Sequence, residues 1–259
     1  MRRDAWAGAQ QRARPETSAG AQQPDGALLG PLLAGSAQPH QVRRAAQGLG
    51  LPERGRYAVV VLGTAATVPD GDGDGDGDGD GDGDGARWCW CGEVGVVLLG
   101  RGGLAGPVGS LGEAGAGPGG VSPVVGGLAE LGLARRLAGA ALLTCGPGTH
   151  EIVTLDERLP TALVASRPEL SARLLAEVFG PLLVLEPAER ALLVGTLEVW
   201  LECGGSVGRA AVRLRCHRNT VFNRLRRLER LTSRSLSHPR ELVETVLALD
   251  ALRLSAARG

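Results

Sequence analysis

The chain has 259 residues, of which 43% are hydrophobic and 22% are charged, so it is long and apolar enough for one large or two small domains. Its 28 basic residues, all arginine, balance 28 acidic residues. No apolar run approaches 18 residues, no signal peptide is evident, and the five cysteines lack the spacing of a disulfide framework. We therefore expect a cytoplasmic protein with reduced thiols and no membrane segment.

Residues 1–39 are rich in Ala, Gly, Gln, Pro and Arg and follow no sustained hydrophobic period. Such a composition buries too little apolar surface to fold, so we predict a disordered lead. A helix is predicted at residues 40–49, because apolar residues recur there at helical spacing and Gly50 and Pro52 follow.

Residues 57–63, with the sequence YAVVVLG, predict a short buried strand. Eight Asp-Gly repeats at residues 70–85 then predict an expanded low-complexity loop, because like charges repel along it. Carboxylates at every second residue also suggest calcium binding. A calcium loop needs spaced acids, backbone carbonyl ligands and a closing bidentate Glu. The repeats do not show this pattern, so weak calcium affinity is expected at most.

Further strands are predicted at residues 87–90, 93–99, 121–125 and 152–155, with a helix at 128–143. The Asp-Gly loop is interpreted as a hairpin connection from the strand at 57–63 to the next strands. The Gly-rich residues 100–120 are expected to be irregular. Together, residues 40–160 predict an α+β domain with helices on one face of its sheet.

An amphipathic helix is predicted at residues 168–179 and ended by Gly180 and Pro181, within a linker at 161–186. An all-α domain is predicted at 187–259, starting with a helix that has Pro187 in its first turn. The apolar stripe of that helix consists of Leu193, Leu197, Trp200 and Leu201. A closing helix at 240–254 is expected to seal the bundle or to lie in a dimer interface.

The stretch at residues 204–231 predicts a helix-turn-helix. Ser206 is a good N-cap for a helix reaching Leu214, and the small residues Ala210 and Ala211 permit a close helix crossing. Arg215 and Cys216 form the turn, and either His217 or Asn219 caps the next helix. Val221, Leu225 and Leu228 form the buried stripe of that helix.

The exposed side of the second helix carries hydrogen-bond donors that suit base edges and phosphates in the major groove. The predicted base-reading residues are His217, Arg218, Asn219, Thr220, Asn223, Arg224 and Arg227. The predicted phosphate contacts are Ser206, Arg209, Arg213, Arg215, Arg226 and Arg230.

Charge is concentrated at the same place. Residues 209–234 contain nine arginines and one acidic residue, and residues 188–259 carry a net charge of +6 against −6 for residues 1–187. A solvated basic face on an ordinary bundle would also be arginine-rich. Because helix pair, turn and base-reading side chains coincide with the charge, we predict binding to double-stranded DNA.

The motifs TL..WL..GGS at residues 196–206 and HRNTV..RL.R.E.LT at 217–232 resemble the C-terminal helix-turn-helix domain of PucR/CdaR-type bacterial transcriptional regulators. The resemblance implies that residues 206–214 support a reading helix and that residues 217–227 enter the groove. Where the family usually has Gly, this chain has Ser233. Gly adopts the left-handed conformation of a helix end freely, so Ser233 is expected to cost a little stability.

The middle domain is similar to the degenerate GGDEF-like domain of the same family, through the segments VVVLG, EVGVVLLG and GVSPVV.GL. The acidic metal-binding turn of active cyclases does not occur, so the resemblance implies a binding or dimerising module. Family members often carry a further N-terminal sensor domain, whereas only the short lead is expected before the middle domain here. An effector signal is therefore expected to enter through residues 41–160 or through a partner.

Enzyme motifs are not found. The four histidines have no HxH or HExxH spacing, and neither GxSxG nor GxxxxGK[ST] occurs, so no catalytic residue, cofactor or metal is predicted. Cys89 and Cys91 form only a CxC, with His150 far away, which is a weak zinc signal. The prediction is a DNA-binding regulator, expected to be a homodimer because operators commonly mirror protein two-fold symmetry. The alternative is an adaptor whose Arg-rich helix binds an acidic protein.

Overall fold

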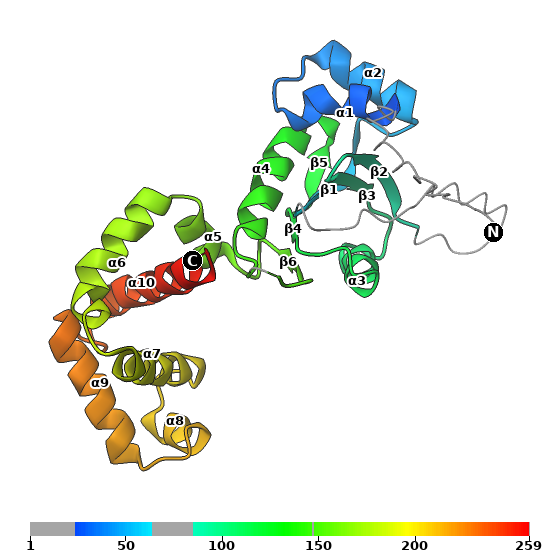
Figure 1. Ribbon diagram of the computed structural model, residues 1–259. Coiled ribbons are helices and arrows are strands. Elements are labelled where there is room, and N and C mark those ends of the chain that lie inside the picture. Colours follow the sequence, from blue (N-terminus) through cyan, green and yellow to red (C-terminus); the bar gives the residue numbers. More distant parts are fainter. Residues whose placement is uncertain (1–23, 64–84, 147, 259) are drawn as a thin grey trace, which may run out of the picture.

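The computed structural model describes residues 24–63, 85–146 and 148–258, which form two lobes (Figure 1). An α+β lobe is followed by an all-helical lobe, as the sequence predicts. The lead at residues 1–23 and the Asp-Gly repeats up to residue 84 lie outside the described residues, and so do the predictions made for them. Among the described helices, none is both long and apolar enough to cross a membrane.

A six-stranded sheet is built around β1 (Arg54–Leu62), with the order β2-β3-β1-β4-β6 and with β5 also pairing to β1. The other strands are β2 (Arg87–Cys91), β3 (Val94–Leu98), β4 (Gly119–Val121), β5 (Val125–Gly127) and β6 (Ile152–Thr154). Only β4 and β6 pair in parallel among these strands. Tyr57 through Val60 are fully buried, which confirms the buried strand predicted there.

The predicted hairpin across the Asp-Gly loop is wrong. β2 and β3 form the hairpin instead, with Cys91 opposite Val94 and the turn at Gly92 and Glu93. β3 is apolar at every position and therefore takes the buried place beside β1, which leaves β2 at the edge. The predicted strand at 121–125 is likewise divided into β4 and β5. Between them the Ser122 hydroxyl accepts a 2.9 Å hydrogen bond from the backbone N–H of Val59.

Three helices cover one face of the sheet: α1 (Pro24–Leu33), α2 (Pro39–Leu49) and α4 (Leu131–Leu142), which follows a short 3-10 turn, η1 (Leu128–Glu130). α1 lies within the predicted disordered lead, so that prediction is wrong for residues 24–39. Leu29 and Leu32 are buried against α2 and the sheet, and this burial orders the segment.

The opposite face is partly covered by α3 (Ala105–Glu113), whose Leu111 packs on Val60 and Leu62. The predictions of irregular structure at residues 100–120 and of helices on one face only are therefore wrong. β1 is apolar on both faces, so a second cover is needed to keep both out of water.

The C-terminal lobe consists of α6 (Pro168–Leu183), α7 (Pro187–Glu202), α8 (Val207–Arg213), α9 (Arg218–Thr232) and α10 (Pro239–Arg258). α6 was predicted to end at Gly180 and Pro181 and to be a linker. It instead continues to Leu183, and Phe179 and Leu182 enter the same core as α7, α8, α9 and α10. Pro181 removes one backbone donor, and burial of these two side chains offsets that loss.

The short helix α5 (Leu159–Ala165) joins the lobes and lies against α10 (Figure 1). The Thr161 hydroxyl donates a 3.0 Å hydrogen bond to the carboxylate of Asp250 on α10. Arg253, one turn further along α10, pairs at 2.8 Å with Glu198 of α7. α10 therefore contacts both the bundle core and the connection to the α+β lobe.

Candidate nucleic-acid interface

The first helix of the predicted helix-turn-helix begins as expected. Gly204 and Gly205 have φ of 60° and 75°, a left-handed pair that ends α7, and the Ser206 hydroxyl accepts a 3.3 Å hydrogen bond from the N–H of Arg209. Ala210 and Ala211 are buried. Because neither side chain extends beyond its β-carbon, α9 can pack closely on α8.

The turn that follows sets where α9 starts. Arg215 adopts a left-handed φ of 53°, and the half-buried Cys216 faces the core. Nδ1 of His217 accepts a 3.2 Å hydrogen bond from the N–H of Asn219, so His217 is the cap of α9. The side chain of Asn219 remains exposed at the first turn.

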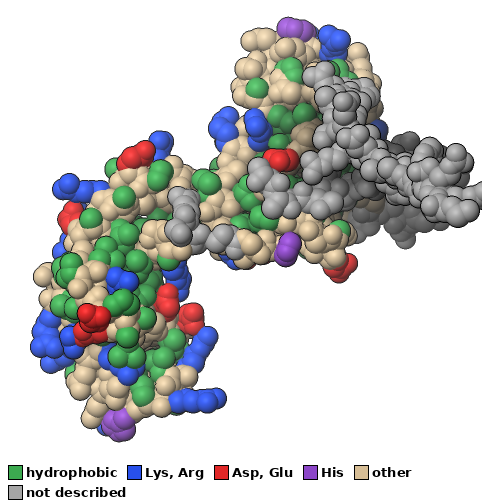
Figure 2. Space-filling view, viewed as in Figure 1, with side chains coloured by type: hydrophobic (Ala, Val, Ile, Leu, Met, Phe, Trp, Pro, Cys, Tyr) green, Lys and Arg blue, Asp and Glu red, His purple; other side chains and the backbone are tan. Residues whose placement is uncertain are grey.

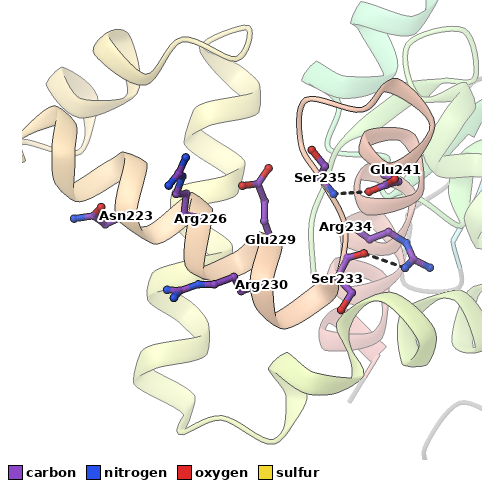
Figure 3. Close-up of a pocket in the computed structure, with 8 residues that line it drawn as sticks. All are labelled: Asn223, Arg226, Glu229, Arg230, Ser233, Arg234, Ser235 and Glu241. Carbon is purple, nitrogen blue, oxygen red and sulfur yellow. Dashed lines mark hydrogen bonds between the residues drawn. The ribbon is translucent and has the colours of Figure 1, made fainter.

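α9 has one buried and one open face. Val221, Leu225 and Leu228 are buried, as predicted. The opposite side carries an exposed stripe at steps of four, three and four residues, which we call the open stripe. It consists of Asn219, Asn223, Arg226 and Arg230. Figure 3 shows the last three of them projecting from α9.

Two predicted base-reading residues lie instead on the flank of α9 that faces α7. Nη1 of Arg224 lies 3.5 Å from the Thr196 hydroxyl, and Arg227 forms an ion pair with Glu189. Arg213, a predicted phosphate contact, pairs at 2.8 Å with Glu202. These arginines already have partners within the lobe.

The remaining predicted DNA-contacting residues differ in whether their side chains already have partners within the protein. Ser206 is used as an N-cap, Arg209 donates at 2.6 Å to the carbonyl of Cys203, and Thr220 is half-buried. Arg215, Arg218, Arg226 and Arg230 are exposed and form no ion pair with any residue in the described part of the chain.

Phe222 was not predicted as a site residue. It lies on α9 beside the open stripe with 46% of its surface exposed, and the guanidinium of Arg226 stands 4.8 Å from the centre of its ring. The sequence carries one signal of it: a large aromatic residue at a position that falls outside the buried helical period.

A hollow of about 740 Å³ continues from the open stripe to the turn before α10 (Figure 3). Its acidic side chains are occupied, because Glu229 accepts from the N–H of Leu236 at 2.8 Å and Glu241 from that of Ser235 at 2.6 Å. Arg234 pairs with Glu244 at 2.8 Å. At the hollow, Arg226 and Arg230 form no ion pair among the described residues, and they lie beside the carboxylates of Glu229 and Glu241.

Figure 2 shows Arg side chains along the outer edge of the helical lobe, over the region of α8 and α9. Elsewhere in the described chain, no group of three or more His, Cys, Asp or Glu side chains is arranged to hold a metal ion. Cys89 is buried in the sheet lobe, and burial raises the pKa of the Cys145 thiol to about 11. At neutral pH Cys145 is therefore a protonated donor and not a nucleophile.

Comparison with known families assigns the helical lobe. Residues 193–251 match the model of the PucR C-terminal helix-turn-helix domain. This segment is a PucR-type helix-turn-helix domain. The match includes α8, α9 and most of α7 and α10, and thus the whole open stripe.

A regulator of polyketide synthase expression from Bifidobacterium adolescentis is similar at 19% identity, over 90% of this chain and 98% of that one, with a TM-score of 0.36. No curated protein matches the chain.

The end of α9 yields a stability prediction. Ser233 has φ of 51°, the left-handed conformation in which the PucR resemblance places Gly. We expect Ser233→Gly to raise the free energy of unfolding by about 1 kcal/mol, because the penalty for a β-carbon in this conformation is removed. Urea denaturation of both proteins measures it. A loss of stability would show that the Ser233 side chain contributes more than its backbone conformation costs.

Proposed function

We propose that the protein is a sequence-specific, DNA-binding transcriptional regulator that places α9 in the major groove. The observation that carries the proposal is the open stripe on the second helix of a PucR-type helix-turn-helix domain. A helix of this motif enters the groove with its N-terminal residues at base edges, and amide and guanidinium groups are the donors that read them.

The proposal assigns different roles along α9. Arg218 and Asn219 stand at its N-terminal end and are free to pair with guanine and adenine edges. Arg226 and Arg230, nearer its C-terminal end and at the rim of the hollow, are proposed to contact phosphates. Arg224 contacts Thr196 and Arg227 pairs with Glu189 within the lobe. These two arginines are proposed to contact DNA only after those contacts break.

A homodimer is part of the proposal, because a single reading helix gives modest specific affinity and two-fold operators are matched by two-fold proteins. We propose that the α+β lobe, GGDEF-like in the resemblance, serves as the dimerising or effector-binding module. The hydrogen bond from Thr161 to Asp250 connects this lobe to α10, which supports transmission of a signal to the DNA-binding helices. The place of action would be the cytoplasm, where a bacterial operator lies.

The test is fluorescence anisotropy of the full chain against the duplex of its own promoter and a scrambled duplex, each over a salt series. If about four phosphates are contacted per protomer, log Kd should change with log salt with a slope of magnitude about 4 per protomer. Tighter binding to the promoter supports a regulator. No binding at low salt overturns the proposal and favours the adaptor that binds an acidic protein.

A further inference from the structure

Phe222 is the large apolar side chain exposed on the reading helix. Its neighbours Val221 and Leu225 are buried, whereas Phe222 points away from the core at the next helical position. The residues three and four positions before it are Asn219 and Arg218, so Phe222 lies among the proposed base readers. An exposed aromatic ring on a binding face offers a large, rigid apolar surface to a ligand.

The side chain of Arg226 lies over the ring of Phe222. Its guanidinium lies 4.8 Å from the ring centre, one helical turn beyond Phe222. Nearby Glu229 is engaged by the N–H of Leu236, and Arg226 forms no ion pair among the described residues. The contact therefore holds a free positive charge against an apolar surface on the same side of α9.

This pairing suits one feature of duplex DNA. Base edges in the major groove present hydrogen-bond donors and acceptors, and the thymine C5-methyl is the apolar group among them. A phosphate lies within reach of a cation held beside a side chain that contacts a base edge. An aromatic ring flanked by a free guanidinium thus matches a thymine methyl next to the backbone.

We propose that Phe222 reads thymine through contact with its C5-methyl group, while Arg226, held over the ring, binds the neighbouring phosphate. The inference rests on the proposed function, since it requires α9 in the major groove, and it names a specificity determinant of that site. The preference is for a methyl group at the 5-position of a pyrimidine.

The test uses a duplex recovered by the full chain from a random-sequence library. Each thymine is replaced in turn by deoxyuridine, which removes only the methyl group, and Kd is measured by anisotropy for the wild-type chain and for Phe222→Ala. One or more positions should weaken wild-type binding roughly three- to five-fold, the effect of losing one buried methyl. Phe222→Ala should be insensitive at the same positions.

Two variants control for loss of structure. Leu192→Ala removes a side chain of similar exposure, 47%, on the outer side of α7 and should keep the uracil sensitivity of the wild type. Phe222→Leu keeps an apolar contact and should keep part of the loss of affinity that replacing thymine by deoxyuridine causes. If no thymine is sensitive, or if Phe222→Ala retains the sensitivity, the inference is wrong although DNA is bound. If no duplex is enriched, the proposed function itself fails.

Discussion

Phe179→Ala is expected to lower the free energy of unfolding of the helical lobe by about 3–5 kcal/mol. Phe179 is fully buried and comes from α6, outside the segment matched by the PucR-type domain. It packs into the core that α7, α8, α9 and α10 share, so its removal leaves a cavity beneath α9. A loss of this size is a large part of the 5–15 kcal/mol that typically stabilises a domain.

The measurement is urea denaturation of the full chain followed by far-ultraviolet circular dichroism, with DNA binding measured in parallel. Leu170→Ala is the matched control, because it truncates an apolar side chain of the same helix that is 69% exposed. We expect the control to change stability by less than about 0.5 kcal/mol. Equally small effects of both substitutions would mean that α6 is a linker after all.

α6 illustrates where sequence reasoning failed. Gly180 and Pro181 are strong breakers, and they justified ending a helix there. The helix nevertheless continues, because Phe179 and Leu182 are buried against helices far along the chain. The same kind of non-local burial orders α1, and it also decides that β3 and not β2 lies beside β1. None of these partners is visible in a local window.

The helix-turn-helix was predictable because its signals are local. Ser206, the alanine pair and the period of Val221, Leu225 and Leu228 specify both helices and their crossing within about 25 residues. The partners of the arginines are a different matter. Which side of α9 faces α7 depends on packing, so the pattern did not separate Arg227, paired with Glu189, from Arg226, which is free.

Arg218→Ala is expected to weaken binding to the specific duplex by about 1–3 kcal/mol, or roughly 5- to 150-fold, and to change binding to scrambled DNA far less. Arg218 is the first residue of α9, is exposed, and forms no ion pair within the described residues, so its guanidinium is free to pair bidentately with guanine. Asn219→Ala should act similarly at an adenine. His217, not Asn219, caps the helix, so this substitution preserves the structure.

Arg230→Ala separates base reading from charge. Because Arg230 is proposed to contact a phosphate, its loss should weaken all duplexes alike and reduce the magnitude of the salt slope by about 1. Arg173→Ala removes the same charge from α6, where the side chain is 83% exposed, and should alter neither affinity nor slope by much. Anisotropy on specific and scrambled duplexes distinguishes these outcomes. If Arg218, Asn219 and Arg230 all lose affinity equally on both duplexes, α9 binds DNA by charge alone and the assignment of reading roles is wrong.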